Sequence, residues 1–217
     1  MRFIFEQIRV GGDRNFGYLL GDREAREGML IDPSFAPESL VARAEAQKLR
    51  ITHILNTHGH SDHSNGNTAA KALTGAPVVG GPGHPGLVDR VLRNGDRIPF
   101  GCYHLLAWHV PGHYHDHLAF LIEEMAAGIT GDLLFVGKVG GTESDADACT
   151  EWDSLQRLLR DWPEHITIWL GHDYGARPSS TLAWERETNP FLRCENVEAF
   201  IRLKTQWAGF KAEHGLK

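Results

Sequence analysis

Four potential metal ligands occupy the six consecutive residues His-Gly-His-Ser-Asp-His, from His58 to His63. Imidazole and carboxylate groups bind zinc and similar divalent metals. In an extended segment alternate side chains point the same way, so His58, His60 and Asp62 can converge on one point while His63 reaches a second point nearby. A structural zinc site more often uses closely spaced cysteines, and this run contains none. The run therefore indicates an open, catalytic metal site.

Three further ligand-type residues stand alone later in the chain. His113, Asp132 and His172 each follow a glycine at the end of an apolar stretch, and a glycine hinders the approach of a metal very little. Together with the histidine-rich run they make five histidines and two aspartates. Seven such ligands suit two metals with a shared carboxylate and a bridging water, whereas one metal would not need so many. We therefore expect a two-metal site.

Strands and helices alternate along the chain and would deliver these ligands to one place. Short apolar runs predict strands over 16–20, 28–32, 51–56, 77–80, 96–100, 103–110, 117–123, 128–130 and 166–170. Helical spacing and composition predict helices over 37–48, 63–73, 150–162 and 195–214. No linker rich in proline, serine or glycine divides the chain. We therefore predict a single α/β domain over 1–217 with a short helical tail from about residue 179. The pattern alone does not distinguish two facing sheets with helices on both outer faces from another α/β layout.

Length and composition are ordinary for a globular protein. The 217 residues are 41% hydrophobic and 23% charged, which suits one sizeable core. A net charge of −6 argues against nonspecific nucleic-acid binding. We expect no secretory segment and no membrane span, because no apolar run reaches ~18 residues. Three widely spaced cysteines do not form a disulfide framework, so we expect a cytoplasmic protein. We expect the chain to be a monomer or a homodimer.

The ligand pattern resembles that of the metallo-β-lactamase superfamily, and the resemblance spans most of the chain. It implies an αββα sandwich with the metals at one edge, where the loops at the strand ends meet. It also implies three groups of ligands: His58, His60 and His113 for one metal, Asp62, His63 and His172 for the other, and Asp132 bridging both. Two divalent metals, zinc first and iron or manganese as alternatives, would convert a bound water into hydroxide near neutral pH. Asp62 and Asp132 would then be the catalytic carboxylates, Asp62 orienting the hydroxide.

Within this superfamily the segments 130–135, 171–174 and 189–193 resemble glyoxalase II, the thioesterase that hydrolyses S-D-lactoylglutathione. The resemblance implies hydrolysis of a glutathione thioester or a related acyl-thiol. It carries over three substrate-binding residues, namely Lys138, Tyr174 and Arg193, and cationic groups suit the carboxylates of a peptide thiol. The chain departs from that family by having only sixteen residues, 173–188, before the Asn-Pro-Phe motif. Residues 137–142 also replace the usual glycine–cysteine–glycine loop.

A second resemblance implies a different reaction. Persulfide dioxygenases share the fold and the ligand pattern, but use one Fe(II), bound by two histidines and one carboxylate, to oxidise glutathione persulfide. Residues 178–192 resemble their C-terminal segment about as well as that of glyoxalase II, whereas the arginine-rich loop that follows their bridging aspartate is absent after Phe135. Asp62 and His63 do not discriminate, because dioxygenases can retain both unused. Metal content does: two zincs favour the thioesterase and one iron favours the dioxygenase.

Overall fold

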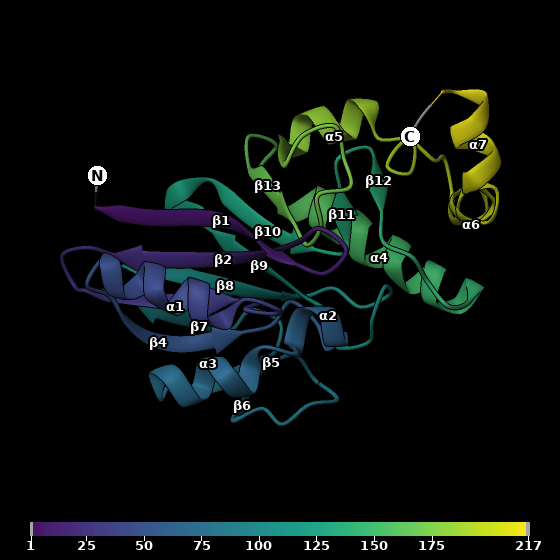
Figure 1. Cartoon of the computed structure of the whole chain (residues 1–217). Coiled ribbons are helices and arrows are strands. Elements are labelled where there is room, and N and C mark those ends of the chain that lie inside the picture. The colour runs from purple at the N-terminus through teal and green to yellow at the C-terminus, as the bar shows by residue number, and fades with distance from the viewer. Residues whose placement is uncertain (1, 216–217) are drawn as a thin grey trace.

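The computed structural model describes residues 2–215 and contains two six-stranded sheets packed face to face, with helices on both outer faces (Figure 1). The first sheet has the order β1 (Phe3–Gly11), β2 (Asn15–Asp22), β3 (Glu27–Ile31), β4 (Arg50–Leu55), β5 (Val78–Gly80) and β6 (Arg90–Val91). The second has the order β14 (Ser179–Thr181), β13 (Thr167–Leu170), β10 (Ala127–Gly131), β9 (Leu118–Ile122), β8 (Tyr103–His109) and β7 (Arg97–Phe100). This is the predicted αββα sandwich.

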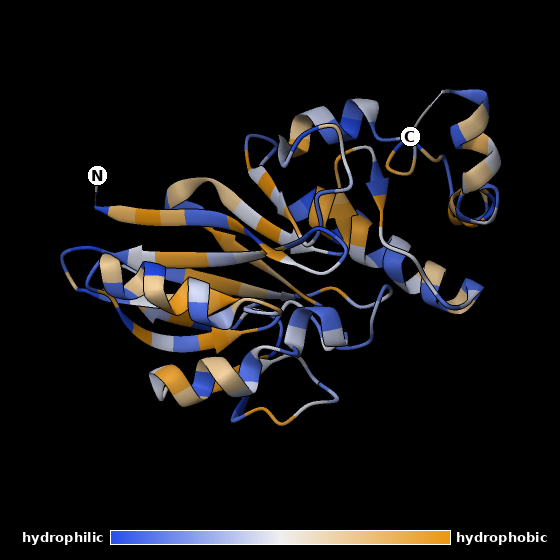
Figure 2. Cartoon of the chain, in the orientation of Figure 1, coloured by the Kyte–Doolittle hydropathy of each residue, from blue (hydrophilic) through white to orange (hydrophobic). Residues whose placement is uncertain are grey.

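Three apolar cores hold the four layers together, and Figure 2 shows apolar residues running along the strands of both sheets. Between the sheets lies a core that includes Tyr18, Phe100 and Phe120. The helices α1 (Pro37–Ala46) and α3 (Asn67–Thr74) cover the first sheet, whereas α4 (Asp145–Asp161), α5 (Leu182–Thr188) and α6 (Val197–Thr205) cover the second. Two short helices, α2 (Ser61–Ser64) and α7 (Trp207–Glu213), a 3-10 turn over 123–125, and the hairpin of β11 (Leu134–Phe135) and β12 (Lys138–Val139) complete the fold.

The strands that precede the ligands end at the same edge of the sandwich. β4 ends at Leu55, just before the histidine-rich run. β10 and β13 are parallel neighbours, so Gly131 and Leu170 pair where both strands end. A bridge between Asn15 and His172 then joins the two sheets at this edge. The topology therefore brings ligands from distant parts of the chain together.

The predicted helix over 63–73 is wrong in one respect, because the structure breaks it into α2 and α3. The carbonyl of His63 accepts a hydrogen bond from Asn56 Nδ2 (3.0 Å) instead of continuing the helical ladder. A side chain at Gly66 would overlap the carbonyl of Pro33, which fixes the turn between the two helices. The predicted end at Gly75 is correct, since this glycine adopts the left-handed conformation that terminates α3 (φ 69°).

Other boundaries also differ from the prediction. α4 begins at Asp145, ahead of the predicted residue 150, because Ser144 Oγ caps it by accepting from the Asp147 amide (3.1 Å). The predicted tail from about residue 179 begins with β14, which pairs with β13, and its helical part is divided into α5, α6 and α7. The edge strand β1 was not predicted. Among residues 2–215 no helix is both long enough and apolar enough to cross a membrane.

Candidate metal centre

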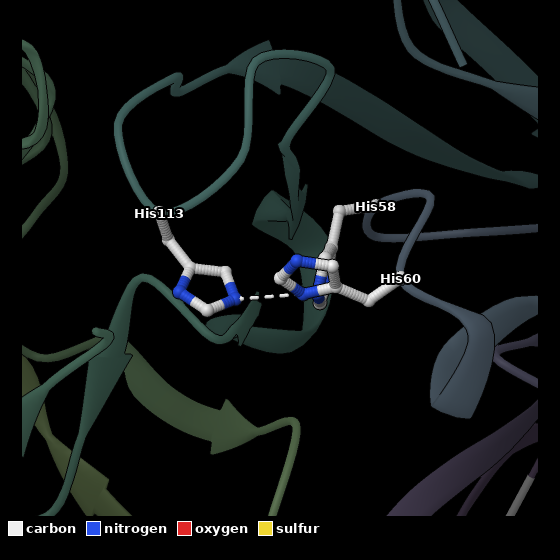
Figure 3. Close-up of side chains that lie close together, drawn as sticks. All are labelled: His58, His60 and His113. Carbon is white, nitrogen blue, oxygen red and sulfur yellow. Dashed lines mark hydrogen bonds between the residues drawn. The ribbon is translucent and has the colours of Figure 1, made fainter. Parts of the chain in front are cut away.

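The three histidines of the first predicted set face one another in the structure (Figure 3). His58 Nε2 lies 2.9 Å from His60 Nδ1, and His113 Nε2 lies 3.1 Å from the same atom. A ring nitrogen has one lone pair or one proton in its plane, so His60 Nδ1 cannot serve both neighbours by hydrogen bonding. Nitrogens bound tetrahedrally to zinc lie about 3.3 Å apart. The three nitrogens therefore fit one divalent metal.

The second predicted set also converges. His63 Nε2 lies 3.2 Å from His172 Nε2, and Asp62 Oδ2 lies 3.4 Å from His172 Nε2 and 3.8 Å from His63 Nε2. These three ligand atoms form a second group that can hold a metal ion. Asn15 Nδ2 donates to Asp62 Oδ2 (3.0 Å) and to its backbone carbonyl (3.1 Å), which holds that carboxylate toward the two histidines.

Asp132 lies between the two sets. Its Oδ2 is 3.2 Å from His172 Nε2 and 3.7 Å from His113 Nε2, while its Oδ1 is 3.5 Å from His63 Nε2. One carboxylate thus faces histidines of both groups, as the predicted bridging ligand would. The amide of Asp132 donates to His117 Nε2 (3.1 Å), and the His117 ring stacks on His58 with centroids 4.9 Å apart. These contacts fix the aspartate from behind.

Hydrogen bonds on the far side of the rings set which nitrogen is free to bind a metal. In three cases the outer nitrogen, Nδ1, faces an oxygen that only accepts, so Nδ1 carries a proton and Nε2 is the nitrogen that a metal at the centre would bind. The three pairs are His63 Nδ1 with Asp32 Oδ2 (3.0 Å), His113 Nδ1 with Gly141 O (2.7 Å) and His172 Nδ1 with Asp13 O (2.8 Å). Asp32 directly follows β3 and was not predicted, although an acidic residue just after a buried strand was a visible signal.

Electrostatics separate the ligands into neutral and ionised groups. Burial, reinforced by the neighbouring histidines, lowers the pKa of His58 well below its usual value, and burial also lowers the pKa of His113. For His63, burial is outweighed by Asp132 and Asp32, which raise its pKa to about 9. Although burial opposes it, the adjacent His63 and His172 hold the pKa of Asp132 far below its usual range. His58 and His113 are therefore neutral donors beside an ionised carboxylate, whereas a metal at the second set would have to displace a proton from His63.

One geometric expectation is wrong. The run from His58 to His63 is not extended throughout, because α2 begins at Ser61. Asp62 and His63 therefore lie in a helical turn, and Asp62 groups with His63 and His172, not with His58 and His60. The types and spacing of the residues indicated a metal site. Which of them lie together depends on where the extended part of the run ends, just before Ser61.

A cavity of about 750 Å³ adjoins the second set through Tyr174, whose ring stacks on His172 with centroids 4.5 Å apart. Lys138 Nζ lies 4.4 Å from the centre of the Tyr174 ring, and Arg14 Cζ lies 4.9 Å from it. Lys211 from α7 also lines the cavity. The walls therefore combine aromatic surface with three cationic groups, which suits an anionic ligand with an apolar part.

Only two of the three predicted substrate-binding residues line this cavity. Lys138 and Tyr174 line the cavity, whereas Arg193 is exposed and does not. The Asn-Pro-Phe motif acts locally instead: Asn189 Nδ2 donates to Lys138 O (3.2 Å) and so holds the hairpin that carries Lys138. Sequence reasoning missed Arg14 and Lys211, because neither belongs to a motif and both reach the cavity through tertiary structure.

Comparisons with known proteins are consistent with this geometry. The model of the metallo-beta-lactamase superfamily matches residues 11–172. A hydroxyacylglutathione hydrolase of Rhodospirillum rubrum is 39% identical over 88% of this chain and 75% of its own length. The human mitochondrial persulfide dioxygenase ETHE1 is 31% identical over 94% of this chain and 79% of its own. The crystal structure of ETHE1 from Myxococcus xanthus matches with a TM-score of 0.86 and 30% identity, covering 94% of this chain and 91% of that one.

Proposed function

The chain belongs to the metallo-β-lactamase superfamily, and within it we propose that the protein is a metal-dependent hydrolase that cleaves a thioester, S-D-lactoylglutathione or a related glutathione conjugate. One observation carries this proposal: two complete ligand groups are joined by one carboxylate, Asp132. A two-metal hydrolase would use both groups, whereas a one-metal dioxygenase can retain Asp62 and His63 unused, so metal content has to separate the two. The similarity to a hydroxyacylglutathione hydrolase supports the substrate class.

The residues present fit two divalent metals. His58, His60 and His113 would hold one, Asp62, His63 and His172 would hold the other, and Asp132 would bridge them. Nitrogen and carboxylate donors suit zinc first, with iron(II) and manganese(II) as alternatives. Such metals would supply an acidified water, with a pKa of roughly 7, and a Lewis acid for the thioester carbonyl.

The chain's own side chains orient the reactants. Asp62 is the more exposed of the two carboxylates, with 38% of its side chain accessible against 9% for Asp132. Asp62 can therefore accept a hydrogen bond from an attacking water and aim it, while Asn15 keeps the carboxylate in place. Asp132 stays ionised behind the reacting atoms.

The cavity beside Tyr174 would bind the thiol part of the substrate. Arg14, Lys138 and Lys211 line it and can pair with the carboxylates of glutathione. Tyr174 stacks on the ligand His172, so a thiol held against this ring ends next to the metal centre. This arrangement places recognition and chemistry in adjoining spaces.

A second candidate function has its own supporting observation. The crystal structure of ETHE1 from Myxococcus xanthus matches 94% of this chain with a TM-score of 0.86. The alternative is a persulfide dioxygenase with one Fe(II) held by two histidines and one carboxylate. It would oxidise glutathione persulfide with dioxygen.

Metal analysis combined with two assays separates these functions. Protein expressed without added metal is analysed for zinc, iron and manganese per chain, then assayed with S-D-lactoylglutathione and with glutathione persulfide in the presence of oxygen. Two metals per chain and thioester hydrolysis support the hydrolase. One iron per chain with oxygen consumption on the persulfide, and no hydrolysis, would replace it with the dioxygenase.

A further inference from the structure

A buried ion pair lies behind His113, outside both ligand groups. Glu151 on α4 is fully buried, and the side chain of Lys204 on α6 is only 11% exposed. Lys204 Nζ donates to Glu151 Oε2. Removing two charges from water is costly, and an apolar pair of similar size is often at least as stable. The burial of this pair is therefore not explained by stability alone.

Lys204 also holds the loop that orients a predicted ligand. Its Nζ donates to Gly140 O (2.7 Å), and the next carbonyl, Gly141 O, accepts from His113 Nδ1 (2.7 Å). The loop packs tightly against the metal centre, since a Cβ on Gly140 would lie 2.9 Å from His113 Nδ1. A shift of this loop would therefore move the acceptor that fixes the tautomer and ring direction of His113.

Glu151 packs against the residue that precedes His113. Gly112, which precedes His113, has φ +139°, and a Cβ there would overlap the backbone of Glu151. One residue of α4 thus packs against the backbone that carries His113 and, through its carboxylate, holds Lys204. Together the two residues fix the segments on both sides of the ligand, Gly112 and the Gly140–Gly141 loop.

We propose that Lys204, held by Glu151, is a positioning residue for the first metal: it connects the C-terminal helix α6 to His113 through the Gly140–Gly141 loop. The inference rests on the proposed metal-binding role of His58, His60 and His113, but not on the reaction. It assigns to the C-terminal segment a part in assembling the metal centre. Gly140 also packs against the carbonyl of Asp132, so we expect a smaller effect on the second group, Asp62, His63 and His172.

The test measures zinc affinity by competition with a chromogenic chelator, independently of activity. The variants are Lys204→Met and the double variant Glu151→Gln with Lys204→Met, which leaves no unpaired buried charge if the single variant fails to fold. Arg202→Met, an exposed cation on the same helix, is the matched control. We expect one of the two zinc dissociation constants to rise about tenfold, at the low end of effects seen for residues behind a ligand. The other constant and that of the control should stay within about twofold of wild type.

A second comparison separates positioning from general destabilisation. In a His113→Ala background, adding Lys204→Met should change the affinity of the remaining zinc by no more than about twofold, because the ligand that the loop orients through Gly141 is absent. Equal weakening of both zincs, or the same loss with and without His113, would overturn the inference. If the wild-type protein binds fewer than two metals, the proposed function fails by itself, before any variant is compared.

Discussion

At the scale of single residues, Asp62 and Asp132 both lie close to His63 and His172 but differ in burial. Asp132 is buried, whereas Asp62 is partly exposed and can meet water. We expect Asp62→Ala to lower kcat for thioester hydrolysis about 10²- to 10⁴-fold, the range for loss of a positioned proton acceptor. Steady-state kinetics on S-D-lactoylglutathione, with metal content measured for each preparation, tests this. A near wild-type rate in the variant would remove Asp62 from the mechanism.

The cations of the cavity allow a second prediction at this scale. Arg14 and Lys211 line it and Arg193 does not. Arg14→Ala and Lys211→Ala should each raise KM for a glutathione thioester about tenfold with little change in kcat, as expected when binding common to the ground and transition states is lost. Arg193→Ala is the control and should change neither constant. A rise in KM for Arg193→Ala alone would restore the assignment made from the motif.

These residues also mark the limit of inference from the sequence. Lys138 and Tyr174 were predictable because each follows a recognisable ligand segment closely in the chain. Arg14 lies in the turn between β1 and β2, and Lys211 lies on the last helix. Their meeting depends on how the two sheets and α7 pack, which no local pattern encodes.

At the scale of elements, Asp22 holds the end of β2 to its surroundings. It accepts from Arg2 Nε (2.8 Å) and Nη2 (2.7 Å), and from the amide of Cys102 (3.0 Å) in the turn between β7 and β8. The first sheet is thereby tied to the second at the end of β2 opposite to Asn15. The hydrogen bonds from Arg2 hold the pKa of Asp22 well below its usual range.

This gives a pH-dependent prediction for the metal-free protein. A depressed folded-state pKa means that the stabilisation is present above the unfolded pKa of about 3.9 and is lost as pH falls toward the folded value. Asp22→Asn should therefore lower the free energy of unfolding by about 1 to 3 kcal/mol at pH 7, with a smaller difference near pH 3. Urea unfolding at both pH values measures it. Glu123→Gln, in the exposed pair with Arg97, should change little at either pH.

The elements themselves were predictable where periodicity and breakers agreed. The glycine that ends α3 and the apolar strands that precede the ligands follow from local sequence alone. The break between α2 and α3 does not follow from local sequence, because it depends on the hydrogen bond that Asn56, just after β4, donates to the carbonyl of His63. β1 was missed because much of it is only half-buried at the sheet edge, where apolar alternation is weak.

At the scale of the whole molecule, the candidate metal centre lies between the two halves of the sandwich. The first sheet and its loops contribute His58 to His63, and the second contributes His113, Asp132 and His172. The layers followed from the alternation of strands and helices together with the family resemblance. The strand order did not, because β3, β4 and β5 pair in parallel across intervening helices.

Metals that bind between the two sheets should stabilise the folded chain as a whole. A ligand at about a thousand times its dissociation constant contributes about 4 kcal/mol to the free energy of unfolding. For a chain of this size, removal of one such metal should lower Tm by about 8 to 16 °C. Calorimetry before and after dialysis against a chelator, followed by zinc restoration, measures the shift. His172→Ala, which removes a ligand of the second group, should retain a smaller shift than wild type. If stripping both metals left Tm unchanged, the seven side chains would not bind metal between the sheets, because a bound ion that favours the folded state must raise its stability.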